Sequence, residues 1–312
     1  MRVLLTGAAG FIGGHVRSAL LDSEHEVVSV DLLVPSAHGP SPRVEGDLHR
    51  LDVRDQDDMI RALKGVDVVC HQAAIVGTGV DAGDAPAFAS HNDLGTATLL
   101  AAMHRVGCSR LVLASSMVVY GDGLYSCETH GPVRPQPRTV ADLSAGAFDN
   151  RCPIGDEPVN WALVDEDAPL RPQSFYAASK LAQEHFALAW ALGSGGSVTA
   201  LRYHNVYGDL MPRDTPYAGV AAIFRSSLEA GQPPQVYEDG DQTRDFVHVR
   251  DVADANVKAV EERLAAFNPL NICSGNPISI GEVARTISQA RSGPTPVVTG
   301  QYRAGDVRHI VA

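Results

Sequence analysis

Two side chains four residues apart, Tyr176 and Lys180, have the types and spacing needed for proton transfer. They lie near the start of a helix predicted over residues 174–192, where a separation of four places both on one face. A free tyrosine has a pKa of about 10, and lowering it by about three units needs about 4 kcal/mol of preferential phenolate stabilisation. The Lys180 ammonium has the right sign of charge for this. We therefore predict that Tyr176 is a general acid–base group, although a Tyr-x-x-x-Lys run alone often arises by chance.

A serine that can assist this pair, Ser116, follows a strand predicted over residues 110–114. Side chains just past the carboxyl ends of parallel strands line the ligand crevice of an α/β sheet. The Ser116 hydroxyl can bridge a substrate oxygen and the tyrosine there. The plainer interpretation is that Ser115 and Ser116 only cap the strand end.

Three glycines, Gly7, Gly10 and Gly13, lie in the turn between a predicted strand (residues 3–5) and a predicted helix (residues 11–21). Glycine allows a tight turn, a close approach of the backbone to a pyrophosphate, and close packing of the helix on the strand. The start of the helix presents free N–H groups and a partial positive charge to the phosphates. A glycine motif alone can be a simple turn, but the strand before it and the helix after it favour dinucleotide binding.

Asp31 indicates which dinucleotide is bound. It ends the next predicted strand (residues 27–30), about twenty residues beyond the glycine turn, where a carboxylate can accept hydrogen bonds from the adenosine ribose hydroxyls. The same carboxylate would repel a 2′-phosphate. We therefore expect NAD rather than NADP, with a solvated aspartate at the strand end as the alternative. The positively charged nicotinamide ring would add to the stabilisation of the Tyr176 phenolate.

The elements that must position these residues alternate between strands and helices, which predicts parallel strands joined by helical crossovers. The expected fold class is α/β, a doubly wound parallel sheet of the Rossmann type with a smaller C-terminal substrate-binding cap. We expect residues 1–208 to form the NAD-binding domain, with an inserted loop over residues 122–173. Residues 209–312 should form mainly the cap. Further predicted elements are helices over residues 55–64, 92–105, 249–262 and 279–290, and strands over residues 67–71, 198–201, 235–237 and 271–273.

The composition excludes several classes of protein. The 312 residues carry a net charge of −12, which argues against a nucleic-acid or anionic-membrane surface. No run of about eighteen apolar residues occurs, and the N-terminus lacks the pattern of a signal peptide. Five cysteines, scattered and odd in number, suit a reducing compartment. We expect a cytoplasmic protein without nucleic-acid or membrane partners.

Several further runs occur in the order seen in extended short-chain dehydrogenases/reductases of the NAD-dependent epimerase/dehydratase family, which the chain resembles over nearly its whole length. They are His71-Gln72-Ala73-Ala74, Asn92 with Gly95-Thr96, and Asn205-Val206-Tyr207-Gly208. The resemblance implies that Ser116, Tyr176 and Lys180 are the catalytic residues. It also implies NAD contacts from Gly7, Gly10, Phe11, Ile12, Gly13, Asp31, Asp52, Val53, Ala73, Ala74, Asn92, Tyr176, Lys180, Tyr203 and Val206.

The C-terminal part resembles the sugar-nucleotide cap of UDP-galactose 4-epimerase-like enzymes. Arg244 and Arg303 lie in runs that match diphosphate-binding stretches of those enzymes, and charge-assisted hydrogen bonds suit a diphosphate. Each arginine alone can equally belong to a surface ion pair. The resemblance implies a nucleotide-diphosphate sugar as substrate, contacted by Thr78, Ser116, Tyr176, Asn205, Arg244 and Arg303. It also implies a homodimer paired through the helices predicted over residues 92–105 and 174–192.

The residues after Ser116 bear on the type of sugar chemistry. Dehydratases and decarboxylases of this family carry an acid there, because removing water needs an additional acid and base. Met117 and Val118 cannot move protons, which favours a 4-epimerase. The alternatives are a nucleotide-sugar dehydratase or reductase with the same three residues, or a non-catalytic NAD-binding sensor.

The inserted loop resembles that of dTDP-L-rhamnose 4-epimerase-like proteins, which carry two Cys-x-x-Cys pairs in this place. Cys127 and His130 can supply two metal ligands, and Cys152 supplies one, with Asp156 nearby. A tetrahedral zinc site needs four donors. Since the sequence offers only three clear ligands for such a site, we expect a surface loop without metal.

Overall fold

The structure is a computed structural model, and it describes residues 1–39, 46–77, 82–212, 219–264 and 266–312. These residues form two compact units. Unit 1 comprises Met1–Val119, Ser174–Leu210 and Val247–Ile272, and unit 2 comprises Tyr120–Gln173, Met211–Phe246 and Cys273–Ala312.

Unit 1 is built on a seven-stranded sheet in which each adjacent pair of strands is parallel. Such strands need apolar residues on both faces because helical crossovers cover both sides. The chain winds outward in both directions from β1 and β4, and a ligand crevice forms at such a switch point. In spatial order the strands are β13 (Phe267–Ile272), β9 (Ser197–Tyr203), β5 (Arg110–Ser116), β4 (Val68–His71), β1 (Arg2–Thr6), β2 (Glu26–Asp31) and β3 (Leu48–Arg50).

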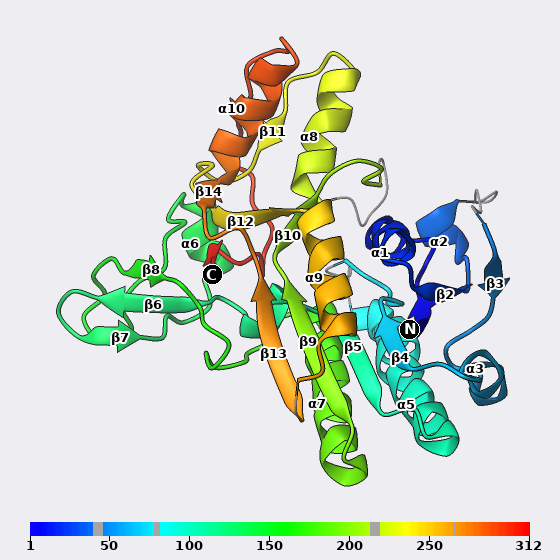
Figure 1. Ribbon diagram of the computed structural model, residues 1–312. Helices are drawn as coiled ribbons and strands as arrows, with labels where there is room; N and C mark the ends of the chain where they lie inside the picture. Colours follow the sequence, from blue (N-terminus) through cyan, green and yellow to red (C-terminus); the bar gives the residue numbers. More distant parts are fainter. Residues whose placement is uncertain (40–45, 78–81, 213–218, 265) are drawn as a thin grey trace. The chain divides into compact units, whose positions relative to one another are not determined.

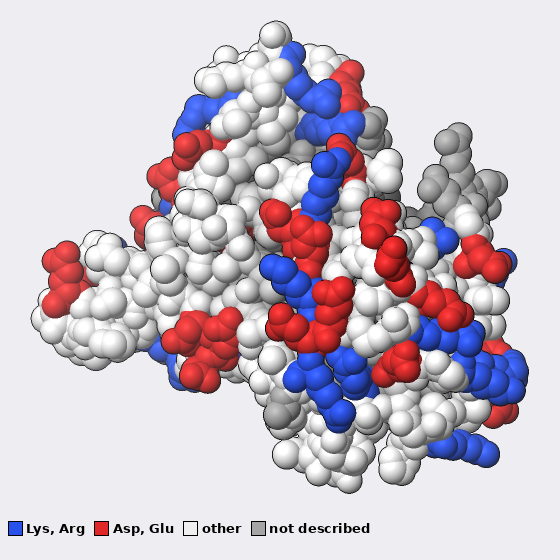
Figure 2. Space-filling model, viewed as in Figure 1, with Lys and Arg blue, Asp and Glu red and all other residues white. Residues whose placement is uncertain are grey.

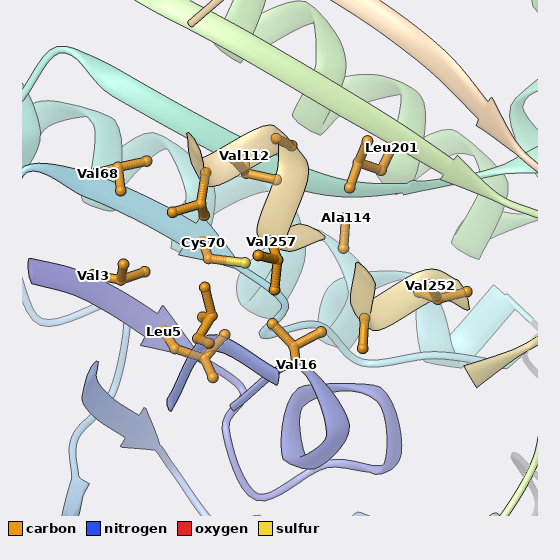
Figure 3. Packing of buried hydrophobic residues seen from close by; sticks show 14 of the residues in the cluster. Val3, Leu5, Val16, Val68, Cys70, Val112, Ala114, Leu201, Val252 and Val257 are labelled. Atoms are coloured by element: carbon orange, nitrogen blue, oxygen red, sulfur yellow. The ribbon is translucent and has the colours of Figure 1, made fainter. Parts of the chain in front are cut away.

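Helices cover the two faces of this sheet (Figure 1). On one face lie α1 (Phe11–Asp22) and α9 (Val249–Glu261). Figure 3 shows Val16 of α1 and Val257 of α9 among the buried side chains of the strands. The other face is covered by α3 (Gln56–Ala62), α5 (Gly95–Val106) and α7 (Phe175–Ser194).

Shorter elements complete unit 1. A π-helical turn, η2 (Ala89–Leu94), leads directly into α5. The remaining short elements are α2 (Pro35–His38), η1 (Ala82–Asp84), α4 (Ala85–Phe88), η3 (Met117–Tyr120), whose last residue belongs to unit 2, and β10 (Asn205–Tyr207).

The described residues of unit 2 form small sheets and three helices. Its apolar core contains Phe224, Val236 and Ile280. A buried arginine, Arg308, bonds to Glu238, Asp239 and Asp149 and ties the inserted segment to the C-terminal residues. The elements are β6 (Leu124–Cys127), β7 (Gly131–Val133), α6 (Val140–Ser144), β8 (Asn160–Ala162), α8 (Val220–Glu229), β11 (Gln235–Val236), β12 (Thr243–His248), which runs on into unit 1, β14 (Pro277–Ser279), α10 (Ile280–Ala290), β15 (Val297–Val298) and β16 (His309–Ile310).

The predicted doubly wound α/β class is confirmed. The division of the chain differs from the expected boundary at residue 208. Residues 247–272 return to unit 1 as α9 and β13, and residues 122–173 lie with unit 2. The reason is that α9 supplies apolar cover for the sheet and β13 extends it beside β9. Within the described residues, no helix is long and apolar enough to cross a membrane.

Candidate functional site

At Gly7 and Gly13 the turn after β1 has no room for a side chain. Gly7 has a φ of +70°, and a Cβ there would lie 2.7 Å from the backbone nitrogen of Ala73. A Cβ on Gly13 would overlap the carbonyl oxygen of Gly7. Gly10 is the residue before α1 and brings no side chain to cap its first amides. The open helix start therefore fits the pyrophosphate of a dinucleotide.

The two residues after Gly10 are partly buried. Phe11 meets His15 edge to face, with ring centroids 5.6 Å apart. Ile12 packs against the apolar cluster beneath α1. Their predicted role in cofactor binding therefore rests on their backbone N–H groups at the helix start.

Asp31 lies at the carboxyl end of β2, beside the glycine turn. Its carboxylate accepts hydrogen bonds from the backbone nitrogens of Ala9 (3.0 Å) and Leu33 (2.8 Å), and His38 Nε2 lies 3.3 Å away. Burial alone would raise the pKa of Asp31, but the hydrogen bonds from His38, Leu33 and Ala9 lower it overall. The group is therefore an anion held in a defined orientation.

Asp52 and Val53 follow β3, next to β2 in the sheet. Arg54 grips the Asp52 carboxylate, with Nη2 to Oδ2 at 2.6 Å, and these hydrogen bonds lower the pKa of Asp52. Val53 is buried, and Gly95 packs so closely on it that a Cβ at Gly95 would lie 2.9 Å from its Cγ2. These contacts fix the loop after β3 against the start of α5.

The segment after β4 is held by Asn92 from η2. Asn92 Oδ1 accepts from the backbone nitrogen of Ile75 (2.8 Å), and Nδ2 donates to the Ile75 carbonyl (2.9 Å) and to Ser179 Oγ (2.9 Å). The Ala73 nitrogen donates to Thr6 Oγ1 at 3.2 Å, and Ala74 is the next residue. Sequence reasoning predicted Asn92 as a cofactor contact. Both of its amide hydrogens join this segment to α7, which makes it a positioning residue; the cofactor contact stays a prediction.

A row of buried polar side chains connects β1, β4 and α5. His71 Nδ1 pairs with Thr6 Oγ1 (2.7 Å), and Nε2 pairs with Thr96 Oγ1 (3.1 Å). Burial, together with the charge of Lys180, lowers the pKa of His71 to about 3. The imidazole is therefore neutral and links β1 and β4 to α5.

Tyr203, Asn205 and Val206 lie at and after the end of β9. The Tyr203 hydroxyl bonds with Gln72 Oε1 (3.0 Å) and with Asn256 (2.8 Å from its Nδ2). Val206 packs against the apolar cluster under α1 and α9. Oδ1 of Asn205 is buried and accepts no hydrogen bond from the described residues, so it is open to a donor on a ligand.

The three predicted catalytic residues come together in unit 1. Ser174 caps α7 by accepting from the Ala177 nitrogen (3.1 Å), which places Tyr176 in the first turn and Lys180 in the next. Ser116 lies close enough to the Tyr176 hydroxyl to lower its pKa through hydrogen bonding. Lys180 Nζ lies 5.9 Å from the centre of the Tyr176 ring.

The electrostatics of this site differ from the sequence expectation. Burial raises the pKa of Tyr176 to about 12, although the bond to Ser116 opposes the rise. Burial also lowers the pKa of Lys180 to about 8, while the charge of Glu184 works in the opposite direction. In the protein alone, Tyr176 is therefore a proton donor. Its use as a base depends on positive charge brought near its oxygen.

Sequence reasoning missed Glu184, one helical turn beyond Lys180. Its Oε1 accepts from Ser115 Oγ and, at 3.0 Å, from Nε of Arg202, and its Oε2 accepts from Nη2 of Arg202 at 2.8 Å. Lys180 Nζ itself donates to the Ala114 carbonyl at 3.0 Å. The position of Glu184, four residues after Lys180 on a helix, was the signal available in the sequence.

The predicted diphosphate ligands lie in unit 2. Arg244 donates from Nη1 to the Arg308 carbonyl (3.0 Å) and from Nη2 to the Val307 carbonyl (2.5 Å). Arg303 lies over the Tyr237 ring, 5.3 Å from its centre. The Asp306 carboxyl interacts electrostatically with both Arg244 and Arg303, which places the two guanidinium groups in one neighbourhood. Thr78 lies outside the described residues.

Comparison with known proteins gives consistent matches. The sequence profile of the NAD dependent epimerase/dehydratase family matches residues 3–140 and 152–273. The dTDP-L-rhamnose 4-epimerase of Burkholderia thailandensis is 34% identical, over 99% of this chain and 86% of its own. The UDP-glucose 4-epimerase of Thermus thermophilus, solved with NAD, is 31% identical with a TM-score of 0.77, over 100% of this chain and 90% of its own. A dTDP-glucose 4,6-dehydratase of Streptomyces venezuelae, also solved with NAD, is 26% identical with a TM-score of 0.77, over 100% of this chain and 88% of its own.

Proposed function

The chain belongs to the NAD dependent epimerase/dehydratase family, and from that premise we propose that it is an NAD-dependent nucleotide-sugar 4-epimerase. It inverts C4 of a nucleotide-diphosphate sugar by transient oxidation to a 4-keto sugar. The observation that carries this proposal is the meeting of Ser116, Tyr176 and Lys180 in one site. The epimerases similar to this chain act on UDP- and dTDP-linked sugars.

NAD fits the residues at the carboxyl ends of β1 and β2. Gly7, Gly10 and Gly13 leave backbone surface bare for a pyrophosphate, and Asp31 offers an oriented anion to the ribose hydroxyls. When bound, NAD supplies an acceptor and donor of hydride and a positively charged ring.

The protein's own groups move the proton. Tyr176 takes the proton of the sugar 4-hydroxyl and later returns it, and Ser116 holds the same oxygen by a hydrogen bond. From a pKa of about 12, bringing the phenol to neutral pH needs about 7 kcal/mol of phenolate stabilisation. Lys180, which is buried and anchored on the Ala114 carbonyl, contributes through its charge.

Epimerisation is favoured over dehydration by the residues that follow Ser116. Met117 and Val118 are partly buried at the end of β5 and carry no acid or base. Water elimination needs such a group near the sugar C6. A dehydratase or reductase on the same scaffold is the second candidate, supported by the likeness to a dTDP-glucose 4,6-dehydratase.

Arg244 and Arg303 are proposed to bind the diphosphate of the substrate. Three backbone carbonyls and the Asp306 carboxyl surround Arg244 and hold its side chain in place. Asn205 is proposed to contact the sugar through its open Oδ1.

No nucleic-acid partner is proposed, because acidic and basic side chains alternate over the face seen in Figure 2.

A homodimer is proposed from the surface of α5 and α7. Large apolar side chains are exposed there, among them Phe186 at 46% and Leu192 at 73%, and exposed apolar patches mark interaction sites. Light scattering should give twice the chain mass of 33.1 kDa at micromolar concentration, and a monomer would contradict the dimer.

Cytoplasmic location is proposed because all five cysteines are free thiols.

Replacing Tyr176 by Phe tests the function. Folding and NAD binding should survive, while turnover should fall about a hundredfold or more, the scale expected for losing an acid–base group. Turnover is measured by NMR at C4 with UDP-, dTDP- and GDP-sugars. Tyr302→Phe removes a hydroxyl that bonds to Ser144 and has no proposed contact with substrate or cofactor; it is the matched control and should keep most of the activity.

The same experiment in deuterated solvent separates the two candidate reactions. An epimerase product should carry no deuterium at C4, because the hydrogen removed there returns to the same carbon. Deuterium at C4 or C5 would indicate carbanion chemistry or dehydration, and the epimerase proposal would then be abandoned.

A further inference from the structure

The inserted segment of unit 2 places Cys127 and His130 at one turn. β6 and β7 form an antiparallel hairpin in which Cys127 lies opposite Gly131. Gly131 has a φ of +71°, which lets the chain reverse directly after His130. Cys127 is 1% exposed, so its thiol points into the protein and not into solvent.

A second tight turn brings Cys152 and Glu157 together. The Cys152 nitrogen donates to the Glu157 carbonyl (2.8 Å), and the Asp156 nitrogen donates to the Cys152 carbonyl (2.9 Å). Cys152 is 2% exposed. Each of the two turns therefore presents a buried thiol beside a second potential metal ligand.

The four side chains converge on one point. Nδ1 of His130 lies 3.5 Å from Cys127 Sγ, 3.4 Å from Cys152 Sγ and 3.3 Å from Glu157 Oε1. All four ligand atoms lie within 4.8 Å of one another. In a tetrahedral zinc site with bonds of about 2.0–2.3 Å, neighbouring sulfur and nitrogen atoms are about 3.6 Å apart, and nitrogen and oxygen about 3.4 Å. The three separations from Nδ1 of His130 match these values.

Hydrogen bonding at Nδ1 of His130 is limited to one hydrogen or one lone pair. Two thiol sulfurs and a carboxylate oxygen nevertheless surround this nitrogen at 3.3–3.5 Å. A cation at the centre would bond to all four atoms at once.

We propose that Cys127, His130, Cys152 and Glu157 bind a structural zinc ion. Two thiolates with an imidazole favour zinc over the hard cations calcium and magnesium. Four protein ligands close the coordination sphere, as in sites that stabilise a fold and do no chemistry. Binding converts both thiols to thiolates and releases their two protons to solvent. The ion joins the two turns of the inserted segment.

The fourth ligand is not the acid that the sequence pointed to. Asp156 is turned outward, with its side chain 82% exposed and paired with Arg151. Glu157 points inward beside Gly155, where a Cβ would overlap its carboxylate. With only Cys127, His130 and Cys152 evident as donors, the sequence predicts no metal. Glu157 supplies the one that was missing.

The metal content of the purified protein tests this proposal. Protein made in zinc-containing medium and purified without chelators should hold about one zinc per chain by mass spectrometry. After removal of zinc and addition of Co²⁺, thiolate-to-cobalt charge-transfer absorption and the visible bands of tetrahedral cobalt should appear. These bands report sulfur ligation, which an ion bound adventitiously at a surface histidine would not show.

Variants assign the ligands. Cys127→Ser and Cys152→Ser should each lose most of the zinc, and Glu157→Gln, a conservative change, should weaken binding in competition with a chromophoric chelator. The matched controls Asp156→Asn and Cys273→Ser should keep full zinc content. Chelation should also make the segment around β6 and β7 sensitive to protease.

Three results would overturn the proposal. The first is wild-type protein with less than about a fifth of an equivalent of zinc and no cobalt–thiolate band. The second is full zinc content in the Cys127→Ser/Cys152→Ser double variant. The third is a titration of denatured protein that finds three thiols instead of five, which would indicate a disulfide between Cys127 and Cys152. The wild-type spectrum decides the matter even if the variants do not fold.

Discussion

Removing Glu184 should destabilise the protein strongly. Glu184 of α7 and Arg202 of β9 are 2% exposed and joined at 2.8 Å between Nη2 and Oε2. Glu184→Ala leaves a charged guanidinium in the interior without its carboxylate. Breaking a buried pair from one side costs about 3–5 kcal/mol. Ser115, next to the proposed catalytic Ser116, also loses its acceptor, so turnover should fall together with stability.

The double variant Glu184→Leu/Arg202→Met separates the cost of leaving a charge buried without a partner from the loss of the ion pair itself. Since no charge is left buried, the double variant should be more stable than Glu184→Leu alone. Comparison with the single variants Glu184→Leu and Arg202→Met should give a coupling free energy of about 2–3 kcal/mol or more. An exposed pair in the same unit, Arg250 and Asp209, has side chains 73% and 75% exposed. Asp209→Ala should change the free energy of unfolding by less than about 0.5 kcal/mol.

Urea unfolding measures these values. The chain has two tryptophans, and in a Trp161→Phe background the fluorescence of Trp190 reports on α7 in unit 1. A domain is stable by about 5–15 kcal/mol, so the Glu184 variant should still fold at low temperature with a much lower midpoint. A loss of stability below about 1 kcal/mol in both Glu184→Leu and Arg202→Met would refute the reasoning that this ion pair is buried and unscreened.

The other predictions concern the cofactor site and its buried histidine. Because the Asp31 carboxylate repels a 2′-phosphate, NAD should bind at least about tenfold tighter than NADP, about 1.4 kcal/mol; equal affinities in calorimetry would contradict this. Gly7→Ala puts a Cβ 2.7 Å from the Ala73 nitrogen at positive φ, so thermal melts should show a loss of more than about 1 kcal/mol and NAD binding should weaken. Gly14→Ala lies inside α1 with its nearest neighbour at 4.0 Å; it is the control and should melt no lower than the unchanged protein, because alanine is favoured over glycine within a helix. His71 titrates near pH 6.5 when unfolded but has a pKa of about 3 in the fold; the unfolded chain thus binds more protons between these values, and stability should fall as pH falls through this window by up to about 1.4 kcal/mol per unit. His71→Gln should reduce that slope in acid titrations of stability, and an unchanged slope would show that the histidine is not buried neutral.

Patterns local in the sequence predicted the fold well. The spacing of Tyr176 and Lys180 is a property of one helix, and the glycine turn is a property of one strand–helix junction, so both could be predicted without knowledge of distant contacts. β3 was not predicted, because three residues with one partly buried side chain carry no periodic signal. The start of β13 at Phe267 rather than Asn271 depends on pairing with β9, about seventy residues earlier in the chain.

Features that depend on tertiary contacts were less predictable. The pKa of Tyr176 rises because the protein around it excludes water, and spacing along a helix says nothing about that burial. Asp156 and Glu157 are adjacent acids, and only the turn, in which Asp156 has a φ of +61°, decides which one points inward. Asn92 reaches Ser179, 87 positions away, through a packing of helices that no local pattern encodes.

Because the chain is synthesised from its N-terminus, the central sheet stays incomplete for a time, and during that time the nascent chain is exposed to aggregation. When Tyr203 has left the ribosome, β9 can pair with β5, but its other edge stays open until β13 follows about seventy residues later. During that time α9 is also missing from the face of the sheet that carries Leu5 and Cys70. Open strand edges and bare apolar surfaces are where nascent chains aggregate. At about 5–20 residues per second, this exposure lasts about 3–14 s, long enough for chaperones to engage the unfinished sheet.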